Sequence, residues 1–320
     1  MPELVCSAAD RDAWPAARRG GVTATDIVTI LGLSPWDSPY SLFWRKLGQV
    51  PEQEDNDRLR LGRDLEPIIS QRWQEEHHRA LRAGREGSVG LYCSQIRPWQ
   101  LATLDRILET GTGLQPVELK SWADADRQAW EDGPPARVRA QVLWQMDVMD
   151  VPAGHVGVLF LPSGEFRSHV IEHADHAPGI EWRTTEGREP LCPACDDILL
   201  MREAGREFHN RIIDNHPPDP DASAATLAAV RARFPRHDTK EAEVDAGTWE
   251  AWCHFKEQAA NYEEAARKLE SQLREQAGEA RRYLVDGQPV ITRVVSEAQV
   301  KAHVRHQDYL RRINRKDDSD

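Results

Sequence analysis

The spacing of the apolar residues alternates along this chain, and that alternation constrains the fold more than any other feature. Helical spacing up to about residue 76 gives way to short strand-like runs between residues 89 and 120. Helical spacing returns over residues 134–149, and two further apolar strands follow, joined by the turn pair Ser163-Gly164. Helices, strands, a helix and again strands predict a mixed α/β layer architecture.

The second half of the chain differs in character. A stretch rich in glycine, proline and charge is followed by a helical pattern, and charged residues at helical spacing then cover about residues 248–283, before the turn pair Asp286-Gly287. We therefore expect a core over residues 1–175 and a linker with a helical extension over residues 176–247. Residues 248–320 should form a long helix, a hairpin and a disordered tail.

Composition and charge exclude several classes of protein. No apolar run approaches the ~18 residues that cross a bilayer, and the first residues lack the basic and apolar regions of a signal peptide. We expect a cytoplasmic protein with no membrane partner. The five cysteines are odd in number, which favours reduced thiols. The net charge of −12 argues against a protein that coats nucleic acid, although an enzyme can confine its basic residues to one groove.

One segment has the composition of a hydrolytic site: Leu104-Asp105, and later Glu118-Leu119-Lys120. Side chains two apart on a strand share a face, so Glu118 and Lys120 should project together while Leu119 enters the core. Magnesium prefers oxygen ligands. Asp105 and Glu118 could ligate such an ion, and Lys120 could orient water or offset charge in the transition state. An ordinary surface strand can also carry Glu-x-Lys, so the interpretation depends on its context.

Five blocks of sequence, in a fixed order, supply that context. They are Arg18–Ile27 with Leu31–Trp36 and Ser38–Phe43, Gly62–Pro67, Ala102–Arg106, Glu118–Lys120 and Gln141–Met146. On these blocks the chain resembles the YqaJ-type viral recombinases, the family that includes the lambda exonuclease, over about residues 14–172. One block alone would be weak, whereas several in order with compatible gaps are specific.

The resemblance implies a fold and an activity. The expected fold is α/β, with a restriction-endonuclease-like PD-(D/E)XK core, a mixed central sheet flanked by helices and a mainly helical C-terminal extension. The implied activity is a Mg²⁺-dependent DNA exonuclease, with Mn²⁺ able to substitute, that digests linear duplex ends 5′ to 3′ in phage-type recombination and DNA repair. The implied partners are duplex DNA ends, a single-strand annealing protein and further copies of the chain in a ring, inside a bacterial host cell.

The resemblance also implies roles for single residues. Asp105, Glu118 and the Leu119 carbonyl would be metal ligands, and Glu66 would add a carboxylate. Lys120 would be the catalytic lysine, and Gln141 would help position the water.

A second group of residues matches the positions that hold the 5′ phosphate in the family: Arg18, Thr25 and Thr103. An arginine fork and hydroxyls near a helix N-terminus suit a phosphate, although Thr25 could simply start a helix and Thr103 simply favour a strand. Leu104 replaces a frequent proline, and Arg106 replaces a glycine and could contact a phosphate. Trp36, in a loop, could contact DNA.

A second metal site is a further expectation. His173, His176, Cys192 and Cys195 could hold a tetrahedral Zn²⁺. A single CxxC pair is a weak signal, and the same residues are compatible with a loop that carries two unrelated thiols.

Three other functions stay open at this point. An endonuclease with the same PD-(D/E)XK core would cut closed circles. A non-catalytic DNA-end-binding scaffold would bind without cutting, but the intact set of Glu66, Asp105, Glu118 and Lys120 counts against it. A structural coiled-coil protein, suggested by residues 248–283, leaves the first half of the chain unexplained.

Overall fold

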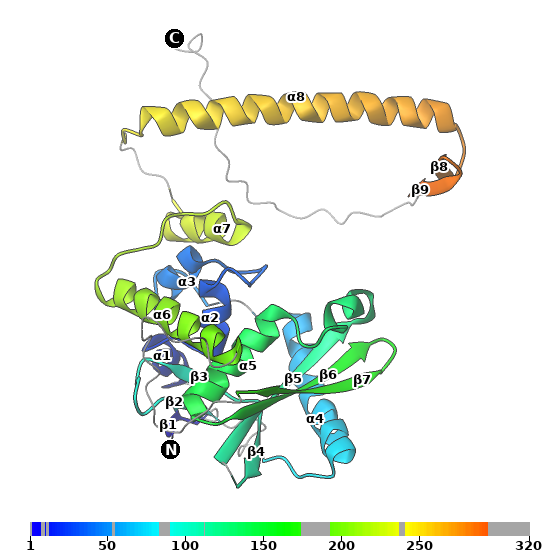
Figure 1. Ribbon diagram of the computed structural model, residues 1–320. Coiled ribbons are helices and arrows are strands. Elements are labelled where there is room, and N and C mark those ends of the chain that lie inside the picture. The colour runs from blue at the N-terminus through cyan, green and yellow to red at the C-terminus, as the bar shows by residue number, and fades with distance from the viewer. Residues whose placement is uncertain are drawn as a thin grey trace. The chain divides into compact units, whose positions relative to one another are not determined.

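The computed structural model describes residues 2–7, 10, 13–52, 55–82, 90–111, 113–173, 193–236 and 241–293 (Figure 1). The chain divides into two compact units, Met1–His237 and Asp238–Asp320, and each is described by itself. Within the described residues, no helix combines the length and the apolar character that crossing a membrane requires.

A four-stranded mixed sheet forms the centre of the first unit (Figure 1). Its strands, in spatial order, are β4 (Arg106–Thr110), β5 (Gly113–Ala123), β6 (Ala153–Leu161) and β7 (Phe166–Glu172). β5 pairs in parallel with β6, whereas the two outer pairs are antiparallel. A parallel pair needs a crossover, and a 3₁₀ helix (Asp124–Trp130) followed by α5 (Ala136–Met149) supplies it.

A smaller antiparallel sheet joins three short strands. They are β1 (Glu3–Cys6), β2 (Leu91–Cys93) and β3 (Leu101–Thr103). The sequence analysis singles out neither β1, which has four residues, nor β4, which has five.

Four helices precede the sheets or lie between their strands. They are α1 (Ala13–Arg19), α2 (Ala24–Ile30), α3 (Pro39–Lys46) and α4 (Asp57–His77). α2 and α3 follow Thr23 and Ser38, residue types that favour the start of a helix, and both have a complete capping box. At α2 the Thr23 hydroxyl accepts from the Asp26 N–H, and the Asp26 carboxylate accepts from the Thr23 N–H.

Side chains alternate between the two faces of the central sheet. Val156 and Val158 of β6 belong to the large core that α5 and α2 share. Leu119 of β5 belongs to a second core with Ile69 and Trp73 of α4. Helices therefore pack on both faces of a mixed sheet, which confirms the mixed α/β class expected from the sequence.

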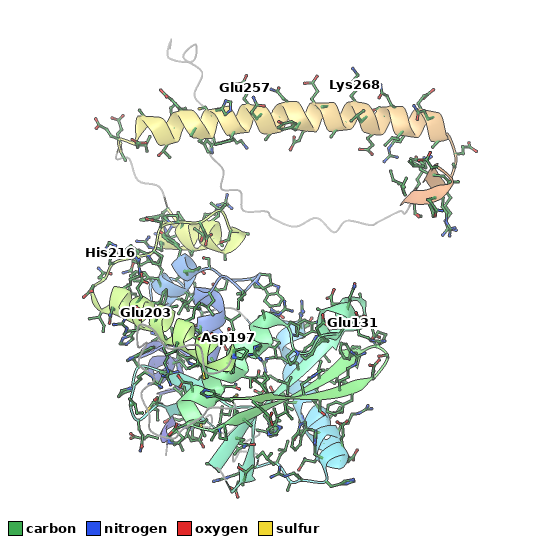
Figure 2. The ribbon with its side chains drawn as sticks, in the orientation of Figure 1. Glu131, Asp197, Glu203, His216, Glu257 and Lys268 are labelled. Carbon is green, nitrogen blue, oxygen red and sulfur yellow. The ribbon has the colours of Figure 1, made fainter. Side chains whose placement is uncertain are left out.

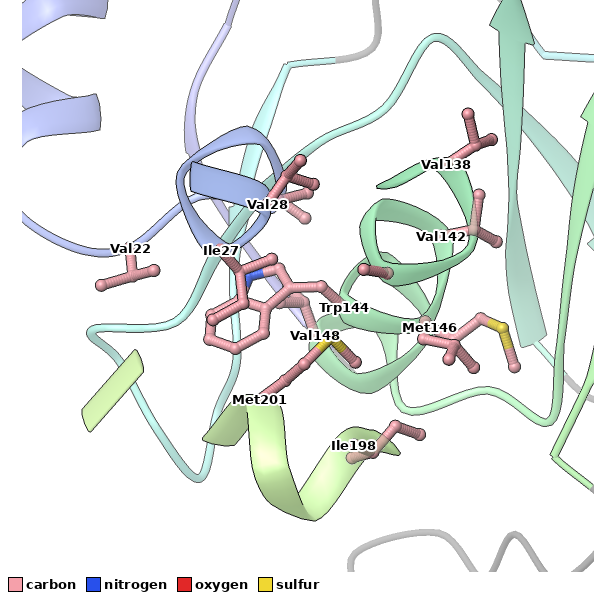
Figure 3. Packing of buried hydrophobic residues seen from close by; sticks show 14 of the residues in the cluster. Val22, Ile27, Val28, Val138, Val142, Trp144, Met146, Val148, Ile198 and Met201 are labelled. Carbon is pink, nitrogen blue, oxygen red and sulfur yellow. The ribbon is translucent and has the colours of Figure 1, made fainter. Parts of the chain in front are cut away.

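Two later helices, α6 (Pro193–Ile213) and α7 (Ala224–Arg233), belong to the same unit. The polar side of α6 carries the exposed Asp197 and Glu203 (Figure 2). Its apolar side meets α2 and α5, as Figure 3 shows for Ile27, Trp144 and Met201. The sequence places a boundary after residue 175, but the compact unit extends to His237 because α6 and α7 contribute buried side chains to its core.

The second unit holds α8 (Ala246–Ala277) and a hairpin of β8 (Arg282–Val285) and β9 (Gln288–Thr292). The hairpin turns at Asp286 and Gly287, both with positive φ, as the sequence predicts. The helix, expected to reach Tyr283, ends at Ala277 because Gly278 follows with positive φ. Charged side chains project from α8, among them Glu257 and Lys268 (Figure 2).

Candidate active site

β5 places Glu118 and Lys120 on one face of the sheet and Leu119 on the other. Leu119 packs in the core beneath α4, and its neighbours on the strand face α5 instead. This is the arrangement that strand alternation predicts. The Lys120 ammonium donates to Glu118 Oε1, so the ammonium and the carboxylate are in direct contact.

Two glutamines of α5 hold the Glu118 carboxylate. Gln141 Nε2 donates to Oε1 at 2.6 Å, and Gln145 Nε2 donates to Oε2 at 2.6 Å. The side chain of Glu118 is only 2% exposed, so these amides and Lys120 replace the water that a carboxylate normally binds. Gln145 is a site residue that the sequence analysis does not select. Its signals are its place in the Gln141–Met146 block and its spacing of one helical turn from Gln141.

Asp105 and Glu66 complete the carboxylate cluster. Asp105, between β3 and β4, accepts a hydrogen bond from the Leu119 N–H at 2.8 Å. Burial raises its pKa well above the usual range, and the negative charges of Glu118 and Glu66 raise it further. Glu66 on α4 has a pKa raised mainly by burial and partly by Glu118, against the opposing effect of Arg106. The pKa of Lys120 is raised, because the attraction of Glu118 and Asp105 outweighs the opposing effect of burial.

Arg106 has a different place from the one expected. Its side chain is buried, its Nη1 donates to the Asp105 carbonyl at 2.6 Å, and the same atom lies 3.8 Å from Glu66 Oε2. It therefore joins the two segments that carry Asp105 and Glu66, and it does not present its guanidinium to solvent as a phosphate ligand would.

The charges of this cluster fit a cation. Three carboxylates, Glu66, Asp105 and Glu118, face Lys120 and Arg106 as the nearest positive groups, so negative charge is in excess where burial makes it costly. Carboxylate oxygens are what Mg²⁺ prefers. Over the described ranges, no three acidic, imidazole or thiol groups stand close enough together to form a metal-binding set. The carboxylate oxygens instead contact Lys120, the glutamines and the backbone.

The predicted phosphate ligands fall in two places. Arg18 and Thr25 line one cavity of about 360 Å³, and Thr103 is absent from its lining. Thr103 lies on β3, where its carbonyl accepts from Gln145 Nε2 at 3.1 Å and its hydroxyl oxygen is buried. The structure thus brings Arg18 and Thr25 together and puts Thr103 beside the carboxylate cluster.

Lys46 supports that cavity and was not selected from the sequence. Its buried ammonium donates to the Arg18 and Gly21 carbonyls, both at 2.7 Å, and forms an ion pair with Asp26 at 2.5 Å. The pKa of Lys46 is lowered overall, because burial and the charge of Arg18 outweigh the opposing effect of Asp26. The residue fixes the backbone of the segment that presents Arg18.

Two of the four predicted zinc ligands are in contact. His173 Nε2 lies 2.9 Å from Cys195 Sγ, and both residues are buried. His176 and Cys192 lie outside the described residues. The zinc site stays a prediction.

Part of the chain is similar to a known protein family. Residues 13–154 match the YqaJ-like viral recombinase domain. The uncharacterized protein YqaJ of Bacillus subtilis (strain 168) is 23% identical over 276 residues, which cover 84% of this chain and 79% of that protein.

Solved structures with a similar course include an alkaline exonuclease and a phage-related exonuclease. An alkaline exonuclease from Laribacter hongkongensis is 19% identical, with a TM-score of 0.47 over 64% of this chain and 94% of that one. A phage-related exonuclease from Haemophilus somnus is 11% identical, with a TM-score of 0.42 over 61% of this chain and 96% of that one.

Proposed function

We propose that the chain, whose residues 13–154 match the YqaJ-like viral recombinase domain, is a metal-dependent deoxyribonuclease that digests duplex DNA from its ends. The observation that carries the proposal is the contact of Glu118 and Lys120 on one face of β5, with Asp105 and Glu66 beside them. A carboxylate cluster with one lysine suits hydrolysis of a phosphodiester, because the reaction needs both a cation and a positive charge near the phosphate.

Mg²⁺ is the proposed cofactor, with Mn²⁺ as a substitute. Asp105, Glu118 and the Leu119 carbonyl would hold the ion, and Glu66 would supply a further carboxylate. When bound, the ion would act as a Lewis acid and make its water more acidic.

The chain's own residues position the remaining chemistry. The pKa of Lys120 is raised, so its ammonium keeps its charge and can offset the negative charge that develops on the phosphoryl oxygens. Gln141 and Gln145 fix both oxygens of Glu118, so the carboxylate is oriented before substrate arrives. Such preorganised groups reorient little during the reaction, which is the source of their effect.

The cavity beside α2 is the proposed binding site for the DNA end. Arg18 and Thr25 line it, and its wall holds four cationic side chains and three carboxylates, which leaves a small excess of positive charge. Guanidinium and hydroxyl groups bind phosphate well. A 5′ phosphate held there would favour digestion 5′ to 3′ and leave a 3′ single strand, which a single-strand annealing protein could take up. A ring of several copies would keep the enzyme on its DNA.

Digestion of matched DNA substrates tests the proposal. Linear duplex with a 5′ phosphate, the same duplex with a 5′ hydroxyl, and closed circular DNA would each be incubated with Mg²⁺ or with EDTA. We expect Mg²⁺-dependent loss of the linear DNA, faster with the 5′ phosphate, and intact circles.

Other outcomes of the same experiment contradict parts of the proposal. Cutting of the circles would make the protein an endonuclease. Binding of linear DNA without any digestion would make it an end-binding scaffold. Equal rates on the phosphorylated and hydroxyl ends would remove the role given to Arg18 and Thr25.

A further inference from the structure

Two tryptophans and two arginines form a cluster at the edge of the candidate active site. The Arg137 guanidinium carbon lies 4.2 Å from the centre of the Trp122 ring and 5.1 Å from that of Trp36. The Arg58 guanidinium carbon lies 5.5 Å from the centre of the Trp36 ring. These four residues are called the tryptophan–arginine cluster below.

The elements that carry the cluster are the ones that carry the active site. Trp122 stands two residues after Lys120 on the same face of β5, about 7 Å along the strand. Arg137 precedes Gln141 by one turn of α5, about 6 Å along the axis. Arg58 lies on α4, two turns before Glu66. On each of these three elements, a residue of the cluster therefore lies close along the chain to a residue of the candidate active site.

The outer part of the cluster is open to solvent. Trp36 is 59% exposed, although an indole of this size normally buries most of its surface. Trp122 packs inward against Trp130, edge to face, with ring centres 5.1 Å apart. The inner tryptophan anchors the cluster to the core, and the outer one presents part of its ring at the surface.

The two guanidiniums carry charge that no neighbouring carboxylate neutralises by contact. Throughout the described part of the chain, neither Arg58 nor Arg137 has an acidic group within ion-pair distance. Burial lowers the pKa of Arg137 most, the charge of Arg58 lowers it further, and the charge of Asp126 opposes both effects. In a chain of net charge −12, unpaired cations beside an exposed indole favour a ligand that is both aromatic and anionic.

We propose that Trp36, Arg58 and Arg137 bind a nucleotide of single-stranded DNA next to the active site, with the base stacked on the Trp36 ring and the guanidiniums facing its phosphates. The proposal rests on the function proposed above. Bases in an intact duplex are already stacked on one another, so the site selects a strand that has separated from its complement. Every base has a π face, so the site should tolerate all sequences.

A purely structural role makes a different prediction. If the cluster only fastens the loop that holds Trp36 to α4 and α5, its loss should lower the stability of the protein. It should also weaken the binding of every DNA substrate by the same factor. The loss should not alter the difference in affinity between DNA that has bases and DNA that lacks them.

Binding of short single-stranded oligonucleotides in EDTA separates the two roles. One oligonucleotide has all its bases, and a second of equal length has abasic sites. The wild-type protein should bind the first about tenfold more tightly, the range that base stacking on an aromatic side chain gives. Trp36→Ala should remove that difference, and Trp36→Phe should keep most of it. Trp249→Ala, which changes an exposed tryptophan of α8, is the matched control and should behave as wild type.

Each other result is decisive. Full discrimination in Trp36→Ala, or none in the wild type, overturns the stacking site, as does an equal loss for both oligonucleotides. Digestion of linear duplex by the wild type, measured in parallel, reports on the nuclease itself. Digestion without discrimination therefore defeats only the cluster proposal, whereas discrimination without digestion defeats only the proposed function.

Discussion

Gln141 and Gln145 donate to different oxygens of one carboxylate, Glu118 Oε1 and Oε2, each at 2.6 Å. Replacing Gln145 with methionine keeps the volume and removes the donor to Oε2. We expect DNA digestion to slow about 10- to 100-fold, the usual effect of losing a group that orients a metal-site ligand. Initial rates on linear duplex measure this, with the exposed Gln128→Met as control. An unchanged rate in Gln145→Met would contradict the role given to this amide.

The raised pKa of Asp105 predicts a pH-dependent stability. Burial, then Glu118, raises this pKa in the folded state. A raised carboxyl pKa contributes stability below the unfolded value, and that contribution is lost as pH rises through the folded value. Asp105→Asn should therefore stabilise the metal-free protein at neutral pH, with a gain that disappears toward acid pH.

Denaturant unfolding in EDTA over a pH series measures the effect of Asp105→Asn. The exposed Asp126→Asn serves as the matched control and should change little. The same gain at every pH would show that the carboxyl charge is not its cause.

His155 predicts the opposite pH dependence. Burial, followed by the charges of His77 and Arg79, lowers its pKa to about 4, and its Nε2 contacts Gln115 Oε1 at 2.9 Å. The unfolded chain takes up the proton near pH 6.5, so the folded state should lose up to about 3 kcal/mol as pH falls from 6.5 to 4. In His155→Gln, the free energy of unfolding should fall less between pH 6.5 and pH 4, and the exposed His216→Gln should leave this fall, the acid limb of the stability curve, unchanged. An equally steep limb in His155→Gln would exclude His155 as its source.

The packing of α6 on α5 is tested by one methyl group. A Cβ added at Gly205 would lie 2.6 Å from the Trp144 ring, whereas one at Gly62 in α4 meets nothing within 4 Å. Gly205→Ala should therefore destabilise the protein by about 1–3 kcal/mol through overpacking. Gly62→Ala should stabilise it by about 0.5–1 kcal/mol, because alanine favours the helix. Chemical denaturation gives both values, and a neutral Gly205→Ala would mean that α6 is not packed as described.

The elements that the sequence predicts well are those with local signals. Thr23 and Ser38 mark helix starts by their own hydrogen bonds, and Glu118 and Lys120 share a face because strand geometry requires it. The pair Asp286-Gly287 fixes its hairpin turn in the same way.

The rest depends on contacts between distant segments. Gln145 matters because α5 crosses beside β5, and Lys46 because α3 lies against the segment of Arg18. α6 joins the core through the small Gly205, which no pattern within α6 distinguishes from an ordinary helical glycine. Such residues become visible only when the chain is folded.

The most direct test of the account is the rate at which Lys120→Ala digests linear 5′-phosphorylated duplex DNA in Mg²⁺, beside the wild type. Lys120 touches Glu118 and neighbours Asp105, so its removal takes away the positive charge that lies on the catalytic face of β5. We predict rapid Mg²⁺-dependent release of nucleotides by the wild type and a loss of about 100-fold or more in the variant, with both proteins folded by circular dichroism. Equal digestion by the two proteins would place the chemistry elsewhere and contradict the account.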